Sequence, residues 1–346
     1  MKKSLVALAA LAASAAFAQS SVTLSGTMDL GVEKQSATGA LQFTTSNSGT
    51  TNFTMSGSED LGNGLKANFK VSTSFDASYL ASGVNYVNTA DVVGAKFGPL
   101  SPVIGNNDMF VELAGGFGSV KLGRSLDPVF ATIQTVNGTK GVTGFASKNN
   151  ILDGNGVYIA NQMLYTTPSV SGLSAQLSFA ASEIRNTKNN TGASVNYAAG
   201  PLSIGYATST VNTDGASGLA NLSTSAGTFG ANSASTNATL RKGAAVQTLS
   251  GAYDAGVAKI FVTGTQRAEA KGSYNLGVSV PMGAGMLWAD YTANNNTVGA
   301  ITDAAATQLG YKYSLSKRTT AYAQFGTRKV AGTTSQGYGL GVQHNF

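Results

Sequence analysis

The chain has no cysteine among its 346 residues and a single histidine, His344. The absence of cysteine excludes a disulfide framework, a thiol nucleophile and a thiolate metal site. One histidine is too few for a metal centre built from clustered histidine and cysteine ligands. We therefore expect neither a metal ion nor a cofactor.

Charged residues are scarce as well. Only 11% of the residues are Asp, Glu, Lys or Arg, about half the usual share of a soluble globular chain. The formal net charge of +6 is spread along the chain, whereas nucleic-acid-binding proteins concentrate basic residues on one face. No stretch after the N-terminal segment reaches about 18 uncharged apolar residues, which excludes transmembrane helices there.

The N-terminal segment, MKKSLVALAALAASAAFA at residues 1–18, is typical of a cleaved signal peptide. It has two lysines, an apolar core too short to cross a bilayer, and a final Ala-Phe-Ala of the small-x-small type. We predict that residues 1–18 are removed and that residues 19–346 form one domain. Loss of the two lysines lowers the net charge from +6 to +4. An exported protein of this composition is an outer-membrane β-barrel, a soluble β-protein or a polar adhesin.

Apolar residues recur at every second position through residues 19–346, the period of a β-strand. In SVTLSGTMDLGVEK, which starts at Ser21, one face carries Val22, Leu24, Met28, Leu30 and Val32. We count about sixteen such strands. Tight turns are expected at residues 59–64, 115–118, 199–201, 254–256, 281–285 and 316–319. Long stretches rich in Ser, Thr, Asn and Gly separate the strand pairs at residues 36–50, 76–106, 125–160, 181–191, 208–243 and 293–304.

Short turns alternating with long loops are typical of a transmembrane antiparallel β-barrel. Strands of about ten residues cross a bilayer at a tilt, and closure into a barrel pairs every backbone group in the hydrocarbon layer. An even number near sixteen leaves an aqueous lumen. The low charge and a mean hydropathy of +0.03 fit an apolar outer face and a polar inner face. Tyrosines expected near the membrane interfaces are Tyr197, Tyr206, Tyr253, Tyr311, Tyr313 and Tyr322.

Five sequence strings, in order, span the chain after residue 18. They are GSEDLGNGLKA from residue 57, GGFGSVKLGR from 115, NQMLYTTPSVSGLSA from 161, YSLSKRT from 313 and YGLGVQHNF from 338. These strings resemble the Gram-negative general-diffusion porins, especially the beta-proteobacterial branch. The resemblance implies an outer-membrane homotrimer of sixteen-stranded barrels, each a water-filled channel for passive diffusion of small hydrophilic solutes and ions. It also implies contact with outer-membrane lipids and lipopolysaccharide, and insertion by the barrel-assembly machinery.

The resemblance further implies that the third long loop, residues 125–160, folds into the lumen and narrows it. A loop of this length is usually functional. Its charges are Asp127, Lys140, Lys148 and Asp153. In the family, acids on this loop face basic residues on the barrel wall, and the resulting field sorts ions by sign.

Basic residues expected on the wall near this constriction are Arg124, Lys70 and Lys121. Strict alternation would point Arg124 outward, where it would only cap its strand, unless Gly123 forms a bulge. Relatives carry arginines at positions that correspond here to Asn52, Ser56 and Leu164. Because these arginines are missing while the net charge after signal removal is +4, we predict weak anion preference or near-neutral selectivity.

The C-terminal strand YGLGVQHNF alternates to the last residue. Tyr338, Leu340 and Val342 are expected to face lipid, and Phe346 resembles the terminal residue that the assembly machinery recognises. His344 shares this lipid-facing register. A Ser-His-Asp triad needs an imidazole hydrogen-bonded to a nucleophile and an acid, so we predict that the protein is not an enzyme.

There are three alternatives to a general-diffusion porin, distinguished by their sequence or by experiment. A substrate-specific channel would keep the same fold but line its lumen with an aromatic track and paired charges, and the sequence leaves it open. A soluble adhesin would not show heat-modifiable migration after detergent extraction. An outer-membrane enzyme would need a Ser-His-Asp constellation, which the lipid-facing position of His344 disfavours, or clustered metal ligands, for which histidine and cysteine are too few.

Overall fold

The computed structural model describes residues 21–36, 39, 41–45, 47–75, 104–136, 158–182, 188–210, 245–267, 272–294, 304–330 and 332–346. The predicted signal peptide lies outside these residues. Their architecture is all-β, with one short helix, α2 (Pro128–Val136). No helix in the described ranges is long and apolar enough to cross a membrane.

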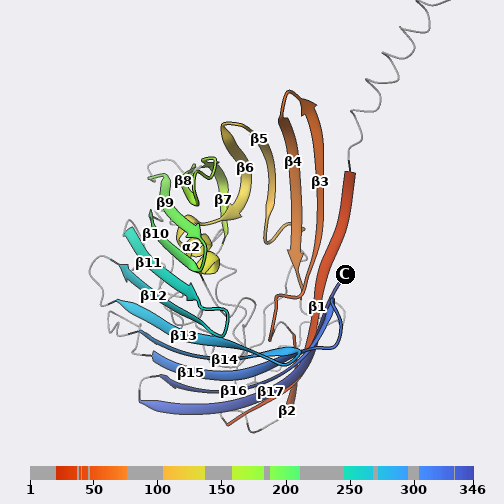
Figure 1. Ribbon diagram of the computed structural model, residues 1–346, viewed down its shortest axis with the longest axis vertical. Coiled ribbons are helices and arrows are strands. Elements are labelled where there is room, and N and C mark those ends of the chain that lie inside the picture. Colours follow the sequence, from red (N-terminus) through yellow and green to blue (C-terminus); the bar gives the residue numbers. More distant parts are fainter. Residues whose placement is uncertain are drawn as a thin grey trace, which may run out of the picture.

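The strands form a single 17-stranded antiparallel sheet (Figure 1). They are β1 (Ser21–Gln35), β2 (Leu41–Thr45), β3 (Asn52–Gly62), β4 (Leu65–Ser74), β5 (Met109–Gly115), β6 (Gly118–Leu126), β7 (Tyr158–Thr166), β8 (Leu173–Ala180), β9 (Asn190–Ala199), β10 (Leu202–Thr210), β11 (Ala245–Asp254), β12 (Lys259–Arg267), β13 (Ser273–Met282), β14 (Gly285–Asn294), β15 (Ala304–Ser314), β16 (Thr319–Val330) and β17 (Thr333–Asn345).

The sheet closes because β17 returns to pair with β1, placing Val342 opposite Leu30. On its other edge β1 pairs with both β2 and β3, so these two strands act as one interrupted strand of the barrel. The result is a closed barrel of sixteen strands plus one extra strand. This confirms the predicted barrel and strand number, and it corrects the interpretation of residues 36–50 as loop alone, because β2 lies within them.

Short turns and long connections lie at opposite ends of the strands, as predicted. The turn between β3 and β4 contains Asn63 and Gly64 with positive φ values of 53° and 77°, the backbone of a tight hairpin turn. The turns after β5, β9 and β13 are equally short, whereas the chain between β4 and β5 and between β10 and β11 is long. Both ends of the described chain, Ser21 and Phe346, lie on the side of the short turns.

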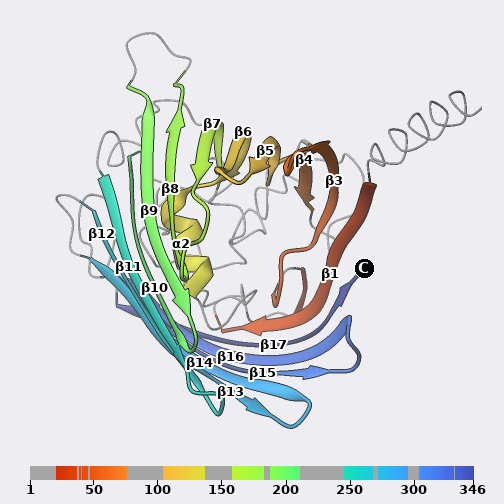
Figure 2. The same ribbon diagram turned by 45° about the horizontal axis from the view of Figure 1, so that its top comes forward.

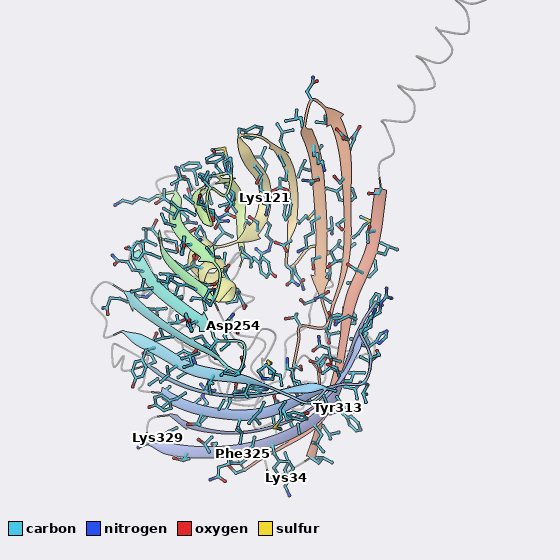
Figure 3. The ribbon with its side chains drawn as sticks, in the orientation of Figure 1. Lys34, Lys121, Asp254, Tyr313, Phe325 and Lys329 are labelled. Atoms are coloured by element: carbon cyan, nitrogen blue, oxygen red, sulfur yellow. The ribbon has the colours of Figure 1, made fainter. Side chains whose placement is uncertain are left out.

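The outer face of the barrel is apolar and the inner face is polar. On β13, Tyr274 and Leu276 are exposed, while the alternating Ser273 and Asn275 are buried. This is the reverse of a soluble sheet, whose apolar face is covered, and it fits a sheet that meets lipid on its outside. Figure 3 shows Lys34, next to the barrel rim, extending from the outer side of the sheet.

Most of the tyrosines expected near the interfaces are exposed on the outer face, among them Tyr197, Tyr206, Tyr253 and Tyr313. Tyr322 is an exception, because its side chain points inward and is only 6% exposed.

Aromatic rings on the inner face cover glycines of neighbouring strands. A Cβ on Gly277 would overlap the ring of Phe261.

Candidate pore constriction

The described part of the third long connection, residues 127–136, lies inside the barrel, as the resemblance implied for this loop. Helix α2 begins two residues after β6 and packs against the inner face of β8, β9, β10 and β11. Val129 and Ile133 form a buried cluster with Ala207 of β10 and Val246 of β11. Figures 1 and 2 show the helix inside the ring of strands. Burial of these apolar side chains fixes the helix to the wall.

Asp127 starts this helix. Its Oδ2 accepts the backbone N–H of Val129 at 3.0 Å, which is an N-cap interaction, and Pro128 at the first helical position suits the fixed φ of proline. Ser209 of β10 donates its hydroxyl to the same oxygen at 3.1 Å. Asp127 is only 2% exposed, so it ties the loop to the wall instead of facing open lumen.

Burial raises the pKa of the Asp127 carboxyl from 3.8 to about 6. The hydrogen bonds from Ser209 and from the backbone N–H groups of Val129 and Phe130 act in the opposite direction and offset part of this effect. The carboxyl therefore titrates close to neutral pH.

The two wall lysines predicted from the sequence point to the inner face and each meets a carboxylate. Lys70 Nζ lies 2.7 Å from Asp108 Oδ2. Lys121 Nζ (Lys121 is labelled in Figure 3) lies 3.8 Å from Glu112 Oε1, whose other oxygen accepts a hydrogen bond from Asn68 at 2.9 Å. Both pairs are partly exposed, so solvent screens them.

Arg124 sits at the bulge that the sequence required. Gly123 has φ 135°, and the pairing of β6 with β7 shifts register between Gly123 and Ser125. The Arg124 Nε donates to the carbonyl oxygens of Asn106 and Asn107, both at 3.1 Å. Its guanidinium lies 5.6 Å from the centre of the Tyr158 ring, a cation–π contact.

Residues 106–108 bring two of the predicted basic residues together, because Asn107 binds Arg124 and the adjacent Asp108 binds Lys70. The two acids that pair with Lys70 and Lys121, Asp108 and Glu112, were not predicted from the sequence. Glu112 was detectable, since it lies on the polar face of the predicted strand around Val111. Asp108 gave no local signal, because it precedes β5 and no strand alternation assigns it to a face.

The three positions where the family resemblance led us to expect arginines hold uncharged side chains on the inner face. Ser56 lies opposite Lys70 in the β3–β4 pairing. Leu164 lies between Lys121 and Ser178 on the neighbouring strands and is 4% exposed. Asn52 donates its side-chain amide to the carbonyl of Thr50. The remaining loop charges of the prediction, Lys140, Lys148 and Asp153, lie outside the described residues.

The C-terminal strand closes the barrel. Its Tyr338, Leu340 and Val342 are about half exposed on the outer face. Phe346 exchanges two backbone hydrogen bonds with Gly26, at 3.0 and 3.1 Å, and its ring lies over that glycine. The Nδ1 atom of His344, on the same outer register, is 2.9 Å from Thr319 Oγ1.

A closed ring of amphipathic strands, apolar outside and polar inside, with a helix folded into it, defines a transmembrane β-barrel channel. The comparisons with known proteins agree with this class. The chain belongs to the Gram-negative porin family, which it matches over residues 4–333. It is therefore an outer-membrane porin, a water-filled channel for passive diffusion of small hydrophilic solutes.

Individual relatives cover most or all of the chain. Outer membrane porin protein 32 of Delftia acidovorans is 31% identical over 396 aligned residues, which cover 100% of both chains. The major outer membrane protein P.IB of Neisseria meningitidis serogroup B is 30% identical over 216 residues, or 60% of this chain and 58% of that one. The solved anion-selective porin from Comamonas acidovorans superposes with a TM-score of 0.70 at 25% identity, covering 95% of this chain and 100% of that chain.

Proposed function

We propose that this porin is a general-diffusion channel with a weak preference for anions. The observation that carries the proposal is the pairing of Lys70 with Asp108 and of Lys121 with Glu112 on the inner wall. Each carboxylate offsets the field of its lysine at a distance, so that these bases attract passing anions only weakly.

Arg124 supplies the remaining preference for anions over cations. Its Nε is held by two backbone carbonyls, which carry no net charge. The Asp108 carboxylate acts on Arg124 only from a distance, and no ion pair of Arg124 is formed among the described residues. The net charge of +4 expected after signal removal has the same sign. Similarity to a porin described as anion-selective supports the direction of the preference.

The test is the zero-current potential of the purified protein in a planar bilayer that separates two potassium chloride concentrations. We expect a small potential of the sign that anion preference produces. A strong cation selectivity would contradict the proposal, and a strong anion selectivity would show that the wall carboxylates do not offset the lysines.

The remaining parts of the proposal concern assembly. We propose a homotrimer, embedded in outer-membrane lipid and lipopolysaccharide, that is exported by the segment at residues 1–18 and inserted by the barrel-assembly machinery. The apolar outer face and the closing position of Phe346 support this view. N-terminal sequencing of the outer-membrane protein should begin at Gln19, and unheated samples should migrate as trimers. The proposed function includes no catalytic activity.

A further inference from the structure

A second segment of the chain folds into the barrel, at the break between β2 and β3. Thr45 lies opposite Leu30 of β1, and Asn52 lies opposite Thr27. Between these two pairs β1 has only Met28 and Asp29, whereas the sequence from Thr45 to Asn52 has six residues in between. A continuous strand would need far fewer residues for this distance, so the excess chain must leave the sheet.

The excess chain leaves on the inner side. Asp29 alternates with the outward-facing Met28 and Leu30, and it is 0% exposed. Its Oδ2 accepts the backbone N–H groups of Ser48 and Gly49, at 2.5 and 2.6 Å. Its Oδ1 accepts the Tyr322 hydroxyl at 2.6 Å. A buried carboxylate that receives several donors is a strong and specific anchor.

Other inward-facing side chains of the wall hold the same segment. Lys312 of β15 donates to the carbonyl of Ser48 at 3.3 Å, and the Ser48 hydroxyl donates to Gln343 of β17 at 3.0 Å. Thr51 donates to the carbonyl of Asp29 at 3.2 Å and accepts that residue's N–H at 3.0 Å. Residues 47–51, which we call the 47–51 segment, are thus seated on β1, β15, β16 and β17.

The seat of the 47–51 segment lies across the barrel from the seat of α2. Helix α2 packs on β8 to β11. Around the ring, β12 to β14 separate the two seats on one side, and β3 to β7 separate them on the other. Figure 2 shows α2 and the β1–β17 junction on opposite sides of the ring.

We propose that the 47–51 segment is a second constriction element of the lumen, facing α2, and that Asp29 is the positioning residue that seats it. Thr50 is the exposed member of the segment, while Asn47, Ser48, Gly49 and Thr51 are buried. Thr50 therefore presents the surface that solutes pass. The inference rests on the channel function of the protein and assigns part of its size limit to residues outside the third loop.

Cysteine modification tests the position of Thr50 directly, because the native chain has no cysteine to interfere. Thr50→Cys and, as a matched control on the outer face, Leu340→Cys are treated with bulky water-soluble methanethiosulfonates during single-channel recording. We expect modification of Thr50→Cys to remove part of the open-channel current in one step. A cationic reagent should shift the zero-current potential toward anion preference, and an anionic reagent toward cation preference.

The control variant should keep its current after the same treatment. If mass spectrometry shows that Thr50→Cys is modified while current and zero-current potential stay unchanged, the segment does not narrow the pore. Failure of Thr50→Cys to react would equally overturn the proposal. Absence of any current through the unmodified wild-type protein would instead contradict the channel function.

The anchor is tested by Asp29→Ala, with Glu59→Gln as a control that removes an exposed acid. Release of the 47–51 segment should increase the conductance and admit larger neutral sugars, whereas the control should match the wild type. Lower thermal stability with unchanged conductance would reduce Asp29 to a structural role. If Asp29→Ala does not fold into a heat-modifiable barrel, the cysteine experiment decides alone.

Discussion

Ser209 on the barrel wall donates its hydroxyl to Asp127 at the beginning of α2, across 3.1 Å, and both residues are only 2% exposed. This contact joins the inward helix to β10 at the point where the chain leaves the wall. The apolar contacts of Val129 and Ile133 then hold the rest of the helix. The position of α2, the proposed constriction element, thus depends on one buried polar contact and one apolar cluster.

Replacing Asp127 by alanine should loosen the beginning of the helix. Loss of an N-cap interaction costs about 1 to 2 kcal/mol, and the hydrogen bond from Ser209 to Asp127 would also be lost. We expect noisier single-channel currents and a higher mean conductance, because the inward loop becomes less constrained. Thr135→Ala at the exposed end of the same helix is the control. Unchanged current noise in Asp127→Ala would show that the apolar cluster suffices.

Asp127 should also make stability depend on pH. Its pKa in the folded protein is about 6, above the ordinary 3.8, so the folded state takes up a proton more readily than the unfolded chain. The stabilisation is complete below pH 3.8 and is lost as the pH rises through 6, by about 3 kcal/mol. Heat-modifiability midpoints, measured between pH 4 and 8, should fall more for the wild type than for Asp127→Asn. Parallel pH profiles would contradict this account.

The pair of Lys70 and Asp108 predicts opposite shifts in selectivity. Asp108→Asn removes the neutralising carboxylate and should increase anion preference, whereas Lys70→Gln should shift the zero-current potential toward cations. The double variant should return close to the wild-type value. Lys34→Gln, which removes a lysine from the outer face, should have little effect. Shifts of the same sign in both single variants would contradict the pairing.

Glycines under aromatic rings should not tolerate a methyl group. In Gly277→Ala the new Cβ would overlap the Phe261 ring and also approach Asp290, and overpacking of this kind costs about 1 to 3 kcal/mol. Gly264→Ala on the neighbouring strand is the matched control, since no atom lies within 4 Å of its Cβ position. The unfolding midpoint should fall only in Gly277→Ala. Equal midpoints would mean that the Phe261 ring moves aside freely.

Deletion of Phe346 should impair assembly. The residue closes the barrel through its two backbone hydrogen bonds with Gly26, and we propose that it also belongs to the assembly signal. We expect a reduced yield of heat-modifiable trimer in the outer membrane, while Phe346→Tyr should assemble normally. Normal trimer yield from the shortened chain would argue against a role in recognition.

The barrel was predictable because its signal is local and repeated. Alternation with period two marks each strand, and the residue pattern around Leu24 or Leu340 is independent of its partners. The short strand β2 was missed because five residues inside a polar stretch give too little alternation. Tyr322 was expected at the membrane interface, but its side chain points inward. The sequence shows only which residues of a strand share a face, and a shift of one residue in register moves every side chain to the opposite face.

The constriction was predictable only in part. Gly123 indicated the bulge that Arg124 needs, and strand alternation placed Lys70 and Lys121 inside. The partners of these residues depend on chain segments that return from elsewhere, as residues 106–108 do. Asp127 was interpreted as a lumen charge because sequence alone does not show that α2 and β10 bury it. Asp29 looked like any other polar residue of its strand.

The most direct test of the general-diffusion account is the swelling of liposomes that contain the purified protein in neutral sugars of increasing size. We predict entry rates that fall smoothly with solute size, with no preference among chemically different solutes of equal size, because the described inner wall carries paired charges and the proposed constriction element α2. Selective entry of one solute class, or no swelling with the smallest sugars, would contradict it.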